Sequence, residues 1–248
     1  MNRLIAVLLL AVEGVWADDA LQIMEQAQKR AAAKSLHYEG TLQVLDAGSK
    51  TIAKSWELDR KGAAGARKML LRFTAPVDIK GVALLILNHA GRAPEEWLWI
   101  PAVGRARRIA TQDRSTRFFG TGFSFEDLEE RDASLFDYKL EGDAVVEGAA
   151  CWKIESRPKQ TRDSQYTRSL LWIRKDNYVV TRTESYLGAV LSRQIVYSDF
   201  AKVDGIWTAR SIEVFDAARN SRTALRLEKL RYDKPMDDGE FTVEALGR

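Results

Sequence analysis

The sequence predicts a mainly β protein, in which short antiparallel strands form a sheet and only a few segments are helical. From residue 36 onward, apolar and polar side chains alternate with a period of two, as in strands that bury one face. The segments with this pattern are separated by turn residues, for example Lys61-Gly62 and Asp204-Gly205. Short strands joined by tight turns indicate a meander of antiparallel strands rather than the alternating β and α units of a nucleotide-binding fold.

The N-terminal residues 1–17 are typical of a secretory signal peptide. Arg3 supplies a positive charge, and residues 4–12 form an apolar run, which is too short for a bilayer core that requires about 20 residues. Val15 and Ala17 are small residues placed for cleavage before Asp18. We therefore expect an exported protein with a mature part of residues 18–248. The alternative interpretation is a buried N-terminal helix.

An amphipathic helix is predicted directly after this segment. Leu21 and Met24 recur at helical spacing on one face, and Asp18 and Asp19 precede them where acidic side chains suit a helix N-terminus. We expect the helix to end near Lys34 and to pack its apolar face on the protein's own sheet.

The remaining chain is predicted to be one domain of strands, with two short non-strand segments. A short helix is expected at residues 124–131, and a terminal helix or hook at 237–246. The predicted strands are 36–44, 52–60, 67–74, 82–88, 96–100, 105–110, 135–141, 151–157, 167–174, 178–186, 190–200, 206–215 and 223–232.

Composition excludes several classes of function. A net charge of +3 gives no electrostatic footprint for nucleic acid. The one cysteine, Cys151, cannot form an intramolecular disulfide, and we expect it to be a buried small side chain. The two histidines, His37 and His89, lie far apart and have no neighbour at metal-ligand spacing. We therefore expect no metal site.

No catalytic constellation is evident. Gly122-Phe123-Ser124-Phe125 begins like a nucleophile elbow, but Glu126 stands where the final glycine is required. Acidic residues are dense nearby, and a solvated helix face is the expected explanation. An envelope hydrolase that uses two of these acids as general acid and base is the alternative. The acidic run comprises Glu126, Asp127, Glu129, Glu130 and Asp132.

Aromatic and aliphatic side chains gather between residues 82 and 125, and a basic patch lies among them. We predict that the apolar set lines a hollow for acyl chains, since each buried CH₂ contributes about 0.8 kcal/mol. A filled core is the alternative. The predicted lining residues are Leu85, Leu87, Trp97, Trp99, Phe119, Phe123 and Phe125. Contact with a lipid headgroup or a partner is predicted for Arg105, Arg107, Arg108 and Arg117, with an ordinary exposed face as the alternative.

Several sequence blocks, in this order and spacing, resemble the outer-membrane lipoprotein-sorting protein family, relatives of the LolA and LolB carriers. One departure is Gly122, where we expect an acidic residue in that family. The blocks are Leu71-Arg72-Phe73, Pro76, Lys80-Gly81, Leu84-Leu85, Glu96-Trp97-Leu98-Trp99-Ile100-Pro101, Arg107-Arg108-Ile109, Phe119 through Leu128, Asp204-Gly205-Ile206-Trp207 and Phe241-Thr242.

The resemblance implies a half-open antiparallel β-barrel with an N-terminal helix packed on or in the sheet. It implies a monomeric periplasmic carrier of lipid or lipoprotein acyl chains, without enzyme activity or cofactor. Its implied partners are an inner-membrane exporter of the resistance-nodulation-division (RND) type and an outer-membrane acceptor. Periplasmic regulators with this kind of fold bind an anti-sigma factor, so a lipid-sensing regulator is the alternative function.

Overall fold

The computed structural model describes residues 13–30, 33–48, 50–160 and 163–248. Helix α1 (Glu13–Lys29) precedes all the strands. Residues 1–12 of the predicted signal peptide lie outside the described residues. The helix differs from the prediction at both ends: residues 13–17 extend it upstream, so Asp18 and Asp19 lie within it rather than at its cap, and it ends at Lys29 rather than near Lys34. No helix in the described part of the chain is long and apolar enough to cross a membrane.

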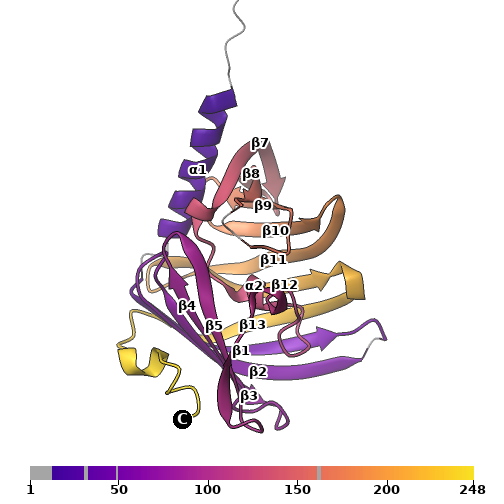
Figure 1. The fold of residues 1–248 in the computed structure, drawn as a ribbon. Helices are drawn as coiled ribbons and strands as arrows, with labels where there is room; N and C mark the ends of the chain where they lie inside the picture. Colours follow the sequence, from indigo (N-terminus) through magenta and orange to yellow (C-terminus); the bar gives the residue numbers. More distant parts are fainter. Residues whose placement is uncertain (1–12, 31–32, 49, 161–162) are drawn as a thin grey trace, which may run out of the picture.

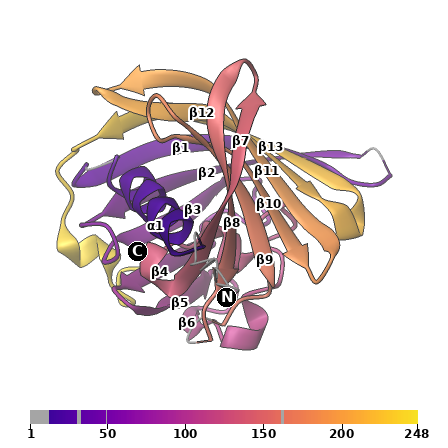
Figure 2. The same ribbon diagram turned by 90° about the horizontal axis from the view of Figure 1, so that it is seen from above.

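All the strands of the described residues form one antiparallel sheet of 13 strands, in the order β6-β5-β4-β3-β2-β1-β13-β12-β11-β10-β9-β8-β7. The sheet thus consists of two meanders, which are joined where β1 pairs with β13. It is strongly curved and remains open, with β6 and β7 as its two edges (Figures 1 and 2). The predicted meander is confirmed, whereas the pairing of the first strand with the last is a long-range contact.

Every predicted strand is present, most with boundaries shifted by a few residues. The first meander comprises β1 (Ser35–Leu45), β2 (Thr51–Lys61), β3 (Lys68–Ala75), β4 (Ala83–His89), β5 (Arg92–Ile100) and β6 (Arg105–Arg108). The second comprises β7 (Phe136–Val146), β8 (Ala149–Pro158), β9 (Arg168–Arg174), β10 (Val180–Leu187), β11 (Val190–Val203), β12 (Ile206–Asp216) and β13 (Ser221–Tyr232).

Residues 109–135, here called the crossover segment, connect the two edges of the sheet. The segment contains η1 (Thr111–Asp113), the short helix α2 (Phe125–Leu128) and η2 (Ala133–Leu135). Ser124 caps α2 in a capping box with Asp127, which confirms the predicted short helix, although it is shorter than expected. Because β6 and β7 are far apart in the sheet, the segment crosses its hollow (Figure 1).

The face of the sheet toward the crossover segment, here called the inner face, carries the largest core. Trp56 on β2 and Phe73 on β3 pack there against Phe118, and the rings of Phe73 and Phe118 stack with centroids 5.2 Å apart. Val214 on β12 and Leu225 on β13 belong to the same core. The crossover segment thus fills much of the hollow that curvature creates.

Two further cores hold the ends of the chain. Ala20, Ile23 and Met24 of α1 pack on Phe136 and Ile154, in β7 and β8. On the opposite face of the sheet, here called the outer face, the C-terminal tail covers the first meander. The tail contains η4 (Asp238–Phe241) and the remaining turns to residue 247, in agreement with the predicted hook.

Gly40 on β1 is required by the close approach of Trp56. A Cβ atom at this position would lie 2.4 Å from Trp56 Nε1 and 2.9 Å from Leu225 Cδ1. We expect Gly40→Ala to lower the free energy of unfolding by about 1–3 kcal/mol through overpacking, measured by urea denaturation. Thr41→Ala, at the neighbouring exposed position of the same strand, is the control and should change stability by less than about 0.5 kcal/mol. If Gly40→Ala and Thr41→Ala changed the stability equally, the close approach of Trp56 to Gly40 would be wrong.

Candidate functional site

Two adjoining cavities remain in the hollow between α1, the crossover segment and the inner face. The first, here called the helix cavity, has a volume of about 360 Å³. Its walls are formed by α1, strands of both meanders and the crossover segment. Its apolar wall includes Met24, Met69, Leu171, Val180 and Tyr197. Its polar wall consists of Gln28, Arg30, Arg60, Arg67, Asn88, Glu129, Glu130 and Arg131.

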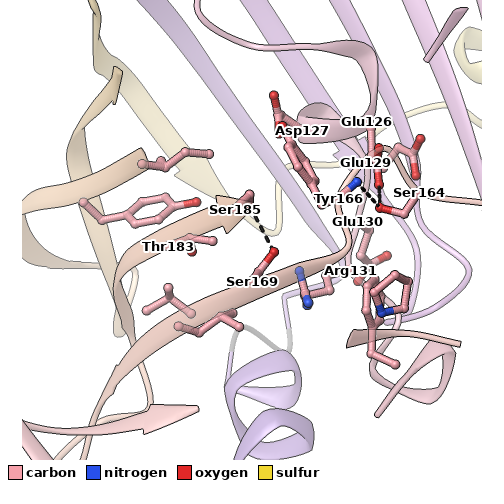
Figure 3. A pocket seen from close by; sticks show the side chains of 16 residues that line it. Glu126, Asp127, Glu129, Glu130, Arg131, Ser164, Tyr166, Ser169, Thr183 and Ser185 are labelled. Atoms are coloured by element: carbon pink, nitrogen blue, oxygen red, sulfur yellow. Dashed lines mark hydrogen bonds between the residues drawn. The ribbon is translucent and has the colours of Figure 1, made fainter. Parts of the chain in front are cut away.

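The second cavity, here called the strand cavity, has a volume of about 220 Å³ and lies along β9, β10 and β11. Figure 3 shows carboxylates of the crossover segment on one side, and Ser169 and Ser185, whose hydroxyls are 3.0 Å apart, on the other. The two cavities share wall residues from Glu129 to Arg131 and also Leu171, Val180 and Tyr197. The two cavities therefore adjoin each other at these residues.

The acidic run is not the solvated face expected from the sequence. The Asp127 and Glu129 side chains are 5% and 2% exposed, and they pair with Arg193 and Arg114 respectively. Glu130 pairs with Arg67 at 2.7 Å. The expectation was wrong because each acid faces a different element, and the arginines that neutralise the acids are mostly distant in sequence. A signal in the sequence that could have predicted this arrangement is an arginine at a strand position where an apolar residue is expected, such as Arg193 on β11.

Asp127 is the centre of a buried polar network that fixes the crossover segment to the sheet. It accepts hydrogen bonds from Ser124 and Tyr166, with the Tyr166 hydroxyl 2.7 Å away. Arg193 on β11 also contacts Asp216, 3.4 Å away. Burial and the neighbouring Asp127 carboxylate raise the pKa of Tyr166, so its hydroxyl stays protonated and donates to Asp127. These acids are structural partners, which leaves the hydrolase hypothesis without support.

The predicted lining residues fall into two groups on opposite faces of the sheet. Phe119, Phe123 and Phe125 belong to the core of the inner face. The other four belong to the core beneath the C-terminal tail, because alternation along β4 and β5 turns them outward: Leu85, Leu87, Trp97 and Trp99. None of the seven lines the helix cavity or the strand cavity. The structure therefore does not bring them together around one hollow.

The predicted basic set is also divided. Arg105, Arg107 and Arg108 are exposed on the edge strand β6. Arg117 is instead engaged within the fold, because its Nε donates to the carbonyl of Thr121 and a terminal nitrogen donates to Ser221. Arg117 thereby ties the crossover segment to β13, and of the four predicted arginines only the three on β6 are exposed.

The unexpected glycine, Gly122, has a packing reason in this chain. Its N–H donates to Thr223 Oγ1 at 2.7 Å, and a Cβ atom would lie 3.1 Å from Val214 Cβ. An acidic side chain at this position would therefore enter the contact between the crossover segment and strands β12 and β13.

Sequence reasoning missed the wall of the helix cavity. Arg60 follows Trp56 and Leu58 on the inward face of β2. The same alternation that identified the strand places this arginine in the hollow, and a cation at the end of an apolar stripe was the available signal. Arg30 directly follows α1 and Arg131 belongs to the crossover segment, and the positions of both over the sheet depend on tertiary contacts.

Comparison with known proteins agrees with this fold. A family model described as "Uncharacterized protein" matches residues 65–248. No curated protein matched the chain. A DUF1329 family protein from Desulfovibrio piger ATCC 29098 is 25% identical, with a TM-score of 0.89 over 93% of this chain and 99% of that chain.

Two further structures carry the fold at lower identity. A putative outer membrane lipoprotein-sorting protein domain from Vibrio parahaemolyticus is 23% identical, with a TM-score of 0.88 over 94% of this chain and 100% of that one. The LolA superfamily protein NE2245 from Nitrosomonas europaea is 18% identical, with a TM-score of 0.72 over 90% of this chain and 97% of that one. The chain therefore belongs to the family of the matching model, and its fold is that of the DUF1329, lipoprotein-sorting and LolA-superfamily structures.

Proposed function

We propose that this protein is a carrier that binds an acyl chain of a lipid or lipoprotein in the hollow of its sheet. The observation that carries the proposal is the helix cavity, a space of about 360 Å³ between α1 and the inner face. Small-molecule sites have volumes of about 300–1,000 Å³ and apolar walls with a few polar groups. The fold of a lipoprotein-sorting protein domain supports the same conclusion.

The acyl chain would lie against the apolar wall formed by Met69, Leu171 and Val180. Each CH₂ group transferred from water to this wall contributes about 0.8 kcal/mol. A chain of modest length would therefore be held without polar recognition, and the polar wall would receive the headgroup.

Entry requires movement, and α1 is the element best suited to it. The crossover segment is fixed by buried ion pairs, for example Asp127–Arg193. By contrast, the described side chains of α1 contact the rest of the protein through the small apolar cluster of Ala20, Ile23 and Met24, together with single polar contacts near its end. Displacing α1 therefore exposes the helix cavity at a lower cost in free energy than displacing the crossover segment.

The resemblance in sequence extends the proposal to the cell envelope. We place the protein in the periplasm after export, as a shuttle between an RND-type exporter of the inner membrane and an acceptor at the outer membrane. The exposed arginines of β6, Arg105 and Arg107, offer a surface for an acidic partner or lipid headgroup. A lipid-sensing regulator would instead form a stable complex with a protein partner.

The test is mass spectrometry of organic extracts from protein purified from the periplasm without detergent. We expect stoichiometric lipid or acylated peptide in the wild type and its loss in Val180→Glu, which places a charge in both cavities. Val145→Glu is the control, because Val145 is 74% exposed on β7. If wild-type extracts are empty and added lipopeptide does not bind, the carrier function is wrong, and a protein partner should be sought by affinity purification.

A further inference from the structure

Arg60 occupies an unusual position on the inner face. In the sheet register it lies between Leu36 of β1 and Met69 of β3. Both neighbours belong to the core of the inner face, and Arg60 itself lines the helix cavity. The guanidinium group therefore belongs to the wall of the proposed lipid site, next to apolar side chains.

Arg60 forms no hydrogen bond or ion pair with any described residue. The contrast is Arg67, one strand away, which pairs with Glu130 at 2.7 Å. A guanidinium group carries five N–H donors. Arg60 thus has its full donor capacity available to a ligand.

Two other arginines of the same cavity also lack a carboxylate partner among the described residues. Arg30 donates to the carbonyl of Trp207 at 2.7 Å. Arg131 donates to the Ser156 hydroxyl, and its guanidinium lies 4.0 Å from the centroid of the Phe136 ring. Both retain unused donors, and the Nε atoms of both are buried without a partner in the described structure. Positive charge in the helix cavity therefore exceeds the negative charge that neutralises it.

The electrostatics of Arg60 are those of a cation whose burial outweighs its attraction to Glu130, Tyr232 and Tyr38. Burial, and after it the neighbouring Arg67, lowers the pKa of Arg60 to about 10. Arg60 still carries its charge at neutral pH, but the charge is held at a cost that a bound anion would offset. Burial likewise lowers the pKa of Arg30.

We propose that Arg60 is the principal contact of an anion site in the helix cavity, with Arg30 and Arg131 beside it. The site would bind the phosphate or carboxylate group of an amphiphile whose acyl chain lies on the apolar wall. A guanidinium fork matches both groups with paired, charge-assisted hydrogen bonds. The inference rests on the proposed carrier function and deepens it, since it selects anionic over neutral amphiphiles.

The test compares two probes that differ only in the anion, 1-palmitoyl lysophosphatidate and 1-palmitoylglycerol, below their micelle concentrations. Isothermal titration calorimetry of the wild type should show the lysophosphatidate bound at least about tenfold more tightly, a difference of about 1.4 kcal/mol. Arg60→Gln should remove this preference and leave the affinity for palmitoylglycerol unchanged. Arg60→Lys, which keeps the charge without the fork, should give an intermediate preference.

The control is Arg226→Gln, an arginine with a 61% exposed side chain on β13, which should bind both probes like the wild type. Arg60→Gln should melt at or above the wild-type temperature, because it removes a charge that has no ion-pair partner among the described residues. A folded Arg60→Gln protein that keeps the preference overturns the site.

Inorganic phosphate provides the third arm of the experiment. If neither lipid binds the wild type, the carrier function fails. Phosphate binding that Arg60→Gln abolishes would then leave the anion site standing as a site for a free anion. Phosphate binding that is absent, or equal in both proteins, would overturn the site as well.

Discussion

Replacing Arg193 by alanine is expected to lower the free energy of unfolding by about 3–5 kcal/mol, because it leaves the buried Asp127 carboxylate without its cation. Arg193 joins Asp127 of the crossover segment to Asp216 of β12, and the three side chains are at most 5% exposed. Equilibrium denaturation in urea, followed by tryptophan fluorescence, measures the change. We also expect α2 to become susceptible to proteolysis, since Asp127 is part of its capping box.

Arg210→Ala provides the matched control for this prediction. Arg210 pairs with Asp199 at 2.8 Å, but its side chain is 47% exposed. Solvent screening limits such pairs to about 0–1 kcal/mol. If the two arginine variants lost the same stability, the crossover segment would not be held by the buried network.

Phe118→Ala is expected to cost about 3–5 kcal/mol as well, through a cavity in the core of the inner face. The Phe118 ring is fully buried and lies against Phe73, Phe119 and Phe125, with centroid separations of 5.2, 5.3 and 5.4 Å. Thermal and urea denaturation both report the loss. The variant also enlarges the hollow, so an apolar probe such as benzene should raise its melting temperature more than that of the wild type.

Val77→Ala is the control for Phe118→Ala, because Val77 is 90% exposed in the turn after β3. It should change stability by less than about 0.5 kcal/mol. A Phe118→Ala protein as stable as the wild type would mean that the crossover segment lies on the sheet without being part of its core.

The strands were predictable because each has a local signal. Alternation along β2 buries Trp56 and Leu58 on one face, and turn residues separate each strand from the next. The boundary of α1 was not predictable, because residues 13–17 suit both the end of a signal peptide and the start of a helix. Pairing of β1 with β13 was not predictable either, since no local property of residues 35–45 identifies a partner almost two hundred residues away.

The site was predicted less well than the fold, for a physical reason. The aromatic residues were predicted to line a cavity because they are large and apolar, but large apolar side chains are also what a filled core requires. Phe123 and Trp99 were expected on one surface, and they lie in cores on opposite faces. The wall of the helix cavity instead contains several polar residues, such as Arg60. A search for apolar residues alone does not find them.

The crossover segment limits how far the curved sheet can open, because it connects the two edge strands. It joins β6 to β7, the two ends of the arc, and it is pinned along its length by Asp127, Glu130 and Phe118. Straightening the arc would pull these buried contacts apart together, so the span of the sheet is fixed. In the carrier proposed above, cargo of different sizes would therefore be accommodated beside α1, while the curvature of the sheet stays constant.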